Sequence, residues 1–514
     1  MAIKIDFKLT PQMLLPKIER LFELSAQKIL SIEKTWKPEH GTPVFTVKGK
    51  YTTRGWTEWT QGFQFGSALL QFDATGDERF LEIGRRNTVE RMATHVSHIG
   101  VHDHGFNNIS TYGNLLRLMR EGKIPFNERE KDFYELALKV SGAVQAARWT
   151  RIADGGGYIH SFNGPHSLFI DTMRSLRSLA VAHQLGHVLR GEQDKKISLL
   201  DRLLDHALMT ARYNVYYGEG RDAYDVRGRT AHETIFNVGS GAFRCPNSQQ
   251  GYSPFTTWTR GLAWAMCGFA EQLEFLQSLS FEDWKAGFQT KESLFPDGPD
   301  QLYALEPLVR AAFATSDFYL VNSCADGIPM WDTGAPNLHW LPGDYFNQPG
   351  DPINKWEPVD SSAAAIAAQG LIRFGNWLRE LAPNPNEEEC WPLMVAAVFR
   401  EHQGKPRRVY TQRTRVIATI RKELAELGVR YRQAALTIAD TLLDEPYLSA
   451  DPKHQGLILH SVYHRPNGWD YVAAGQKVPN GESSMWGDYH ARELALLLLR
   501  EARGEKYLTF FGCV

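Results

Sequence analysis

The pattern of hydrophobic and polar positions is helical along most of the chain. Apolar residues recur three and four positions apart in about twelve segments, which is the spacing of one buried face of an α-helix. We therefore predict helices near residues 11–34, 60–74, 78–97, 109–121, 128–149, 166–186, 194–213, 257–276, 299–322, 361–381, 429–444 and 485–502.

Polar and aromatic clusters stand at the start of every second predicted helix. They read WTEWTQGF, HDHGF, FIDTMRSL, TWTRGLAW, VDSSAAAIAA and MWGDYHAREL. The small residues of SSAAAIAA suit a helix crowded on both sides, whereas the charged GDERFLEIGRRN between clusters suits a helix with one solvated face. This alternation predicts an inner and an outer ring, an all-α (α/α)6 barrel, and a single domain over residues 1–514 whose inner-helix ends line one pocket.

Two stretches depart from this plan, near residues 277–300 and 383–428. The second carries an acidic run followed by a basic one, which is more typical of a solvated helical insertion than of a nucleic-acid patch. Either insertion could cover the pocket or form the contact of a homo-oligomer. Elsewhere, long loops rich in Gly and Asn, such as RIADGGGYIHSFNGPHS, exceed what a helix bundle needs and indicate a function.

Composition narrows the class of partner. The 57 Lys and Arg residues nearly balance the 59 Asp and Glu residues, so the net charge of −2 favours neither nucleic acid nor a membrane surface. The five cysteines are scattered, without a metal-binding or disulfide spacing. The first residues lack the features of a secretory signal, and no apolar run is long enough to span a bilayer, so a cytoplasmic protein is expected. The 14 Trp and 19 Tyr residues are many for such a chain. Core packing accounts for about half of them, and aromatic residues outside a core often line sugar or base sites.

The stretch HVSHIGVHDHGF places four histidines and an aspartate within twelve residues, at positions 95–106. We expect His95 and His98 at the end of an outer helix, and His102, Asp103 and His104 at the start of the next inner one. A zinc site would need three or four converging ligands with supporting partners, which this spacing alone does not indicate. Capping of the helix by Asp103 is the competing interpretation.

At these clusters the sequence resembles the unsaturated glucuronyl hydrolases of glycoside hydrolase family 88. The resemblance extends from about Trp56 to Leu499, apart from the two insertions, and rests on WTQGF, HDHGF, FIDTMRSL, QGYS with TWTRGLAWAMCGFAE, DSSAAAIAA and WGDY in the family's order. It implies removal of a 4,5-unsaturated uronic acid from the non-reducing end of lyase-generated oligosaccharides. In that chemistry an acid protonates C4, water adds at C5, and the hemiketal opens and expels the aglycone. No metal or other cofactor is implied.

The resemblance assigns the acid/base role to Asp171 in FIDTMRSL and a supporting role to Asp103. Because Phe169, Ile170 and Met173 would desolvate the Asp171 carboxyl, we predict a raised pKa for it. An exposed or helix-capping aspartate is the alternative for Asp171.

Further positions match residues that surround the substrate in the family. They are His102, His232, Gln250, Trp258, Arg260, Trp264 and Trp59. Arg260 could pair with the uronate carboxylate or hold a neighbouring aspartate. Two departures concern the substrate: Phe162 stands where the family commonly has a tryptophan platform, and Arg174 or Ser175 stands in place of a family asparagine.

Other functions fit the same helical toroid. Sugar epimerases of the acylglucosamine type use a pair of histidines, and family 105 rhamnogalacturonyl hydrolases share the Asp171-type acid. A non-catalytic sugar-binding protein would keep the tryptophans but need no buried acid.

Overall fold

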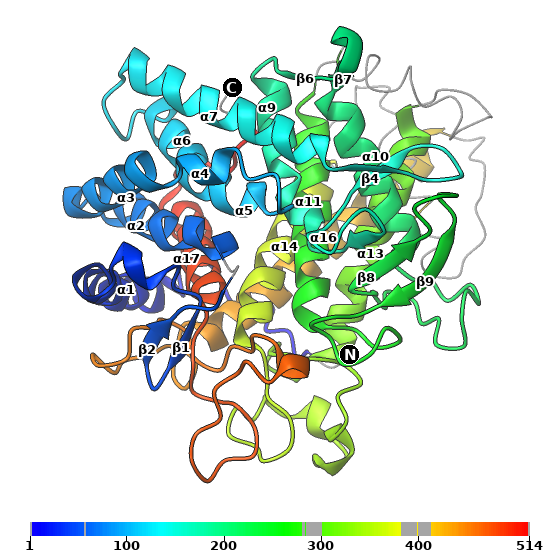
Figure 1. Cartoon of the computed structure of the whole chain (residues 1–514). Coiled ribbons are helices and arrows are strands. Elements are labelled where there is room, and N and C mark those ends of the chain that lie inside the picture. The colour runs from blue at the N-terminus through cyan, green and yellow to red at the C-terminus, as the bar shows by residue number, and fades with distance from the viewer. Residues whose placement is uncertain are drawn as a thin grey trace.

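The helices are arranged in two concentric rings. A computed structural model describes residues 3–55, 58–279, 301–381 and 413–511, together with Asp283 and Val398. Figure 1 shows the helices of the inner ring running through the centre of the molecule, with the outer helices around them. The architecture is the predicted (α/α)6 barrel.

The inner ring is formed by the segments that begin with the polar and aromatic clusters. Going around the ring they are α2 (Gln61–Thr75), the run of α5 (His104–Asn108), η3 (Ile109–Gly113) and α6 (Asn114–Arg120), the pair α8 (Thr172–Ser175) and α9 (Arg177–Gln184), α11 (Thr259–Gln277), α14 (Ser361–Glu380) and α17 (Met485–Arg503). Each packs against the next, and α17 packs against α2 to close the ring.

The outer ring alternates with these segments along the chain. It consists of α1 (Leu15–Thr35), α3 (Glu78–Arg91), α7 (Glu128–Ala147), α10 (Leu199–Tyr213), α13 (Gln301–Asn322) and α16 (Arg413–Leu442), with the short α4 (Ala93–Val96) after α3. Side-chain size explains the difference between the rings. The alanines of α14 are completely buried, whereas α7 buries one stripe and exposes Phe133 and Leu136 on its outer side.

Several predicted segments differ from the structure. The segment predicted as a helix at 194–213 begins with the strand β7 (Lys196–Ser198), so α10 starts only at Leu199. The segment predicted at 166–186 begins with the strand β5 (Ser167–Phe169), because its backbone pairs with β8 (Glu233–Phe236) before the helix starts. The predicted insertion at 383–428 ends earlier than expected, since α16 already begins at Arg413. Most of the predicted insertion at 277–300 lies outside the described residues, as does most of 383–412.

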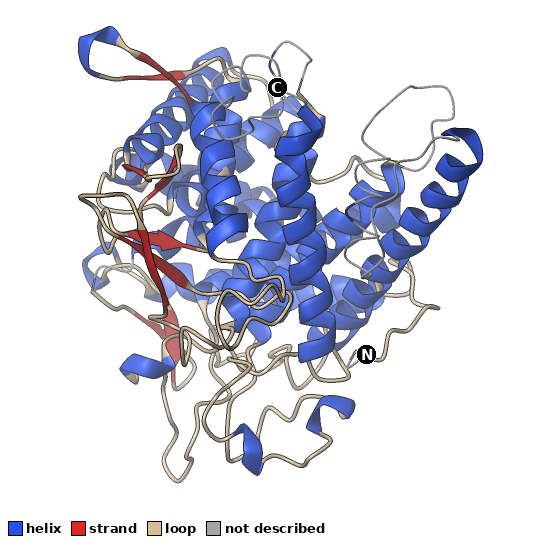
Figure 2. Cartoon of the chain, turned by 90° about the vertical axis from the view of Figure 1, so that its right-hand side faces the viewer, coloured by secondary structure: helices blue, strands red, loops and turns tan. Residues whose placement is uncertain are grey.

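Short antiparallel strands connect the helices. They form the pairs β1 (Phe45–Val47) with β2 (Lys50–Thr52), β3 (Trp149–Arg151) with β4 (Gly157–Ile159), and β6 (Val188–Arg190) with β7 (Lys196–Ser198), and a three-stranded sheet β5–β8–β9 with β9 at Phe243–Asn247. Figure 2 shows these strands along one side of the helical body. The three-stranded sheet places Phe169, two residues before Asp171, opposite Glu233.

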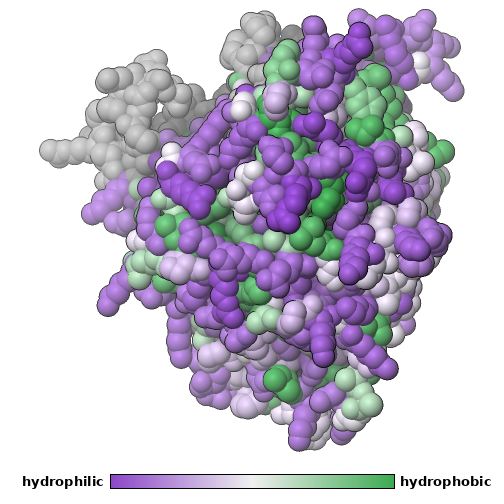
Figure 3. All heavy atoms as spheres, turned by 90° about the vertical axis from the view of Figure 1, so that its left-hand side faces the viewer, coloured by the Kyte–Doolittle hydropathy of each residue, from purple (hydrophilic) through white to green (hydrophobic). Residues whose placement is uncertain are grey.

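The core is essentially continuous through both rings. Figure 3 shows that hydrophilic side chains cover most of the face formed by the first helices, with hydrophobic ones in patches between them. Among the described residues, no helix is both long and apolar enough to cross a membrane.

Candidate active site

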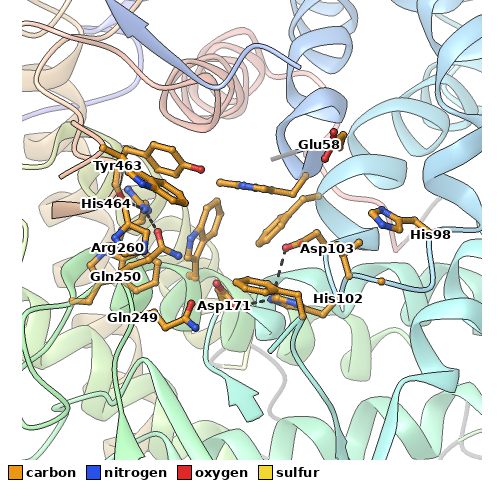
Figure 4. Close-up of a pocket in the computed structure, with 18 residues that line it drawn as sticks. Glu58, His98, His102, Asp103, Asp171, Gln249, Gln250, Arg260, Tyr463 and His464 are labelled. Carbon is orange, nitrogen blue, oxygen red and sulfur yellow. Dashed lines mark hydrogen bonds and ion pairs between the residues drawn. The ribbon is translucent and has the colours of Figure 1, made fainter. Parts of the chain in front are cut away.

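A cavity of about 360 Å³ opens at the end of the barrel where the inner helices begin (Figure 4). Its walls come from the starts of several inner helices and from the loops that precede them. The lining residues are Glu58, Trp59, His98, Gly100, Val101, His102, Asp103, Phe106, Phe162, Asp171, Gln249, Gln250, Trp258, Arg260, Trp264, Tyr463, His464 and Trp469. All the site residues expected from the sequence line this cavity except His232.

Asp103 and Asp171 each stand immediately before a short inner helix, α5 and α8 respectively. At such positions an aspartate commonly caps the helix by accepting a backbone N–H bond. Neither side chain makes that bond, although both residues are buried. The capping interpretation therefore fails for both carboxyls, which face the cavity instead.

His102 connects the two carboxyls. Its Nε2 lies 3.2 Å from Oδ1 of Asp171 and 3.7 Å from Oδ1 of Asp103, as the dashed lines in Figure 4 indicate. The imidazole lies parallel to the ring of Phe162 and edge-on to Phe169, so its orientation is fixed by packing as well as by polar contacts. A single buried imidazole thus forms a hydrogen bond with Asp171 and lies within ion-pair distance of Asp103.

The electrostatics of this triad correct the expectation for Asp171. Burial raises the pKa of Asp171, but the hydrogen bond and charge of His102 outweigh it and the net pKa is lowered. Burial instead raises the pKa of Asp103. Burial lowers the pKa of His102, yet the two carboxylates reverse the sign and the net pKa is raised. The predicted rise in the pKa of Asp171 was wrong because it considered the apolar neighbours of the carboxyl but not the imidazole of His102.

Arg174 and Ser175, the two candidates for the position of the family asparagine, have different surroundings. The Ser175 hydroxyl donates to the carbonyl of His102 at 2.7 Å and accepts the N–H of Gly105 at 2.9 Å. A Cβ at Gly105 would meet the Ser175 carbonyl at 2.2 Å, so only glycine permits this approach. Arg174 points elsewhere, into a buried ion network with Glu271 and Glu493. Ser175 therefore fixes the backbone at His102, whereas Arg174 links the inner helices α11 and α17 through its ion pairs.

Aromatic rings form the opposite wall. Trp59 stacks on Trp486 with centroids 5.1 Å apart, and Phe106 packs between Trp59 and Trp264. Phe162, in the loop before β5, lines the cavity beside His102. The cavity thus combines these rings with the cluster of His102, Asp103 and Asp171, while other ionisable groups line its remaining sides.

Arg260 contacts residues from several segments of the cavity wall. It is fully buried, with its guanidinium 4.7 Å from the ring of Trp258 and 4.6 Å from that of Trp486. It donates to Gln250 Oε1 at 2.5 Å and to the Tyr463 carbonyl at 2.9 Å, and Asp360 lies 3.7 Å away. Most of its donors are therefore engaged by the protein, which favours the anchoring interpretation over a direct two-point grip on a carboxylate.

His232 lies behind the wall. Its Nδ1 accepts the backbone N–H groups of Gln249 and Gln250, and its ring packs between Phe169 and Trp258. Burial lowers its pKa to about 3, which keeps the imidazole neutral and able to accept both bonds. His232 positions the two glutamines.

The other histidines of HVSHIGVHDHGF have separate partners. His95 contacts Gln61 and Asn107, and His104 contacts Ser141 and the His98 carbonyl. Burial lowers the pKa of both rings to about 4. Within the described part of the chain, no three His, Cys, Asp or Glu side chains converge as a metal site would require.

The comparisons with known proteins agree with this geometry. No family model matches the chain. An unsaturated glucuronyl hydrolase from Bacillus sp. strain GL1 is 24% identical over 468 residues, covering 89% of this chain and 90% of the relative. Another unsaturated glucuronyl hydrolase, from Formosa agariphila, is 25% identical over 62% of this chain and 63% of its own. The resemblance to unsaturated glucuronyl hydrolases is thereby confirmed.

The solved structures agree on the fold. The crystal structure of the unsaturated glucuronyl hydrolase from Bacillus sp. GL1, described as responsible for the degradation of glycosaminoglycan, matches with a TM-score of 0.60. The match is 20% identical and covers 95% of this chain and 96% of that one. The (α/α)6 barrel of unsaturated glucuronyl hydrolases thus extends over nearly the whole chain.

Some cavity residues were not expected from the sequence. They are Glu58, His98, Phe106, Gln249, Tyr463, His464 and Trp469, with Gly100 and Val101. Glu58 and Phe106 belong to the clusters WTEWTQGF and HDHGF, so the alternation argument could have included them. The loop YHRPNGWD before α17 gave a signal too, since it gathers aromatic and histidine residues ahead of an inner helix.

Proposed function

We propose that this protein is a glycoside hydrolase that removes a 4,5-unsaturated uronic acid from the non-reducing end of an oligosaccharide. The observation that carries the proposal is the buried triad of Asp171, His102 and Asp103 on one side of an aromatic slot. Hydration of an enol ether needs one proton donor and a base for water, and one carboxyl can perform both steps in turn.

In the proposed reaction, Asp171 gives its proton to C4 and then accepts a proton from the water that adds at C5. The resulting hemiketal opens and the aglycone leaves. Before substrate binds, the lowered pKa of Asp171 and the raised pKa of His102 favour a proton on His102. The negative charge of a bound uronate would raise the pKa of both groups, but the exclusion of water disfavours a charged pair, which raises the pKa of the Asp171 carboxyl and lowers that of the His102 imidazole. Substrate binding therefore moves the shared proton toward Asp171.

The supporting groups have distinct roles in this proposal. Asp103, whose pKa is raised by burial, holds the sugar and tunes the His102–Asp171 pair. Trp59, Trp264 and Phe162 provide ring surfaces for the sugar. Gln250 offers its amide to the sugar while Arg260 fixes its carbonyl oxygen.

The test is to incubate the protein with unsaturated disaccharides from several polysaccharide lyases and follow their ultraviolet absorbance. We expect the absorbance of the C4=C5 chromophore to disappear, with release of one free aglycone for each chromophore lost. The matched control is the same disaccharide with a saturated uronic acid, which should remain intact because it has no double bond to protonate. Cleavage of both substrates at similar rates would instead indicate direct displacement at the anomeric carbon.

A further inference from the structure

Outside the cavity, the loop before α14 carries a pair of stacked tryptophans, of which Trp340 is exposed and Trp356 partly buried. Trp340 ends η5 (Leu338–Trp340) and is 58% exposed. Its ring centroid lies 5.6 Å from that of Trp356, with 25° between the planes. The Nζ of Lys477, from the loop before α17, lies 6.0 Å from the Trp356 ring. We call Trp340, Trp356 and Lys477 the outer platform.

The outer platform lies at the same end of the barrel as the cavity, because both loops lead into the starts of inner helices. Figures 1 and 2 show these loops extending beyond that end of the helical body. The loop of Lys477 also supplies the cavity residues Tyr463, His464 and Trp469. The two sites therefore share a loop.

A chain of contacts joins the outer platform to the cavity wall. Glu357, next to Trp356, accepts the Trp331 Nε1–H at 2.8 Å and the backbone N–H of Asn337 at 3.0 Å. Leu338 and Trp331 pack with Val462, whose carbonyl accepts a bond from Arg260. Hydrogen bonds and apolar packing therefore fix the loop that carries the two tryptophans.

The neighbouring loop is tied to the same support. Asp332 is buried and accepts the backbone N–H of Tyr252 at 2.8 Å, two residues after the cavity residue Gln250. The loops between the cavity and the outer platform are therefore joined by hydrogen bonds.

The chemistry of the outer platform fits an anionic sugar. Large exposed rings without a covering partner mark binding surfaces when they gather beside a charge rather than occur singly. Lys477 and the exposed Lys355 supply positive charge beside the rings. The carboxylates of the same loop are engaged locally, Asp344 by Gln348 and Asp351 by the backbone of Ile353.

We infer that the outer platform binds sugar units of the oligosaccharide that lie beyond the unsaturated residue, with Trp340 as the stacking face and Lys477 as the contact to acidic groups. This inference rests on the proposed function. Binding at the outer platform makes the enzyme more effective on longer anionic oligosaccharides than on disaccharides.

The experiment compares Trp340→Ala and Lys477→Gln with the parent enzyme on an unsaturated disaccharide and on the hexasaccharide of the same uronic-acid polymer. We expect kcat/KM on the hexasaccharide to fall about three- to tenfold, through KM, while the value for the disaccharide stays unchanged. Phe126→Ala is the matched control. Phe126 is 69% exposed but precedes the outer helix α7, at the opposite end of the barrel, so its loss should affect neither substrate.

A second measurement separates this inference from the proposed function. Saturated hexasaccharides of the same polymer should quench tryptophan fluorescence in the parent enzyme, and less so in Trp340→Ala, whether or not any substrate is hydrolysed. Equal effects of Trp340→Ala on both chain lengths, or unchanged quenching, would overturn the inference. So would a concentration-dependent dimer that Trp340→Ala dissociates, because the rings would then be covered by a second copy of the chain.

Discussion

At the scale of single residues, the site depends on one imidazole placed between two carboxyls. His102 determines which carboxyl ionises first, because its 3.2 Å contact is with Asp171 and its contact with Asp103 is longer. Two aspartates that look alike in the sequence thus acquire opposite pKa shifts, and opposite shifts are what separate an acid/base from its supporting group.

Replacing Asp171 tests the acid/base role. Asp171→Asn keeps the shape of the side chain but can neither donate nor accept the proton, so kcat should fall by about 10²- to 10⁴-fold or more with little change in KM. Steady-state kinetics on an unsaturated disaccharide measure this, and circular dichroism checks that the variant is folded. A folded variant with near parental turnover would contradict the assignment.

Replacing Asp103 should make the protein more stable while making it less active. Because the folded pKa of Asp103 is raised, its ionisation costs stability as the pH rises from the ordinary range of an aspartate through the folded pKa. Asp103→Asn escapes this cost, so its Tm should exceed that of the parent at pH 7. The difference should vanish at a pH below the ordinary aspartate range. A Tm difference that does not depend on pH would show that the effect is not electrostatic.

At the scale of elements, the three-stranded sheet positions one wall of the site. Glu233 on β8 is buried and accepts bonds from Asn163 Nδ2 at 2.9 Å, from the Ser167 hydroxyl, and from Asn247 Nδ2 at 2.5 Å. It therefore ties β9 to the loop that carries Phe162, although its carboxylate does not line the cavity.

Removing this tie should weaken substrate binding more than the chemical step. Glu233→Ala frees the Phe162 loop, so KM should rise severalfold while kcat and its pH profile stay close to the parent values. Glu233→Gln keeps an acceptor and should restore much of the affinity. A kcat that falls as far as KM rises, or a shifted pH profile, would place Glu233 within the reacting groups instead.

The elements also show how far the sequence predicts the structure. Apolar periodicity located the long helices such as α11 and α14, because their buried faces are determined by local spacing. It missed β5, since that strand forms only by pairing with β8, more than sixty residues later. The same limit applies to the site: the positions of Asp171 and Asp103 followed from motifs, whereas the sign of the Asp171 pKa shift depended on His102, which lies in the loop before α5.

At the scale of the whole molecule, a buried ion network closes the barrel at the end away from the cavity. Asp73 near the end of α2 contacts Arg117 of α6 at 2.7 Å and Arg500 of α17 at 2.6 Å. These charges hold the pKa of Asp73 well below its usual range despite burial. One carboxylate therefore joins three inner helices, including the first and the last.

Removing this carboxylate should destabilise the whole fold. Asp73→Asn leaves two buried arginines to share one remaining carboxylate, that of Glu121, so the free energy of unfolding should fall by about 3 kcal/mol. Because the folded pKa is lowered, this contribution is present above the ordinary aspartate pKa and is lost as the pH falls below it. Urea denaturation at pH 7 and at acidic pH measures both effects. Lys422→Ala, which removes an exposed pair with Glu426, is the control and should leave stability unchanged.

The packing of α17 against α2 has a consequence for synthesis on the ribosome. Trp59, near the beginning of the chain, completes the cavity wall only by stacking on Trp486 of the last helix. Until α17 emerges, the face of α2 that packs against it stays uncovered, and transiently exposed apolar surface of this kind favours aggregation. The order of translation, which is irrelevant to the finished ring, thus determines how long this surface stays uncovered. A circular permutant that joins the original ends and opens the ring elsewhere would shift that exposure to another pair of helices.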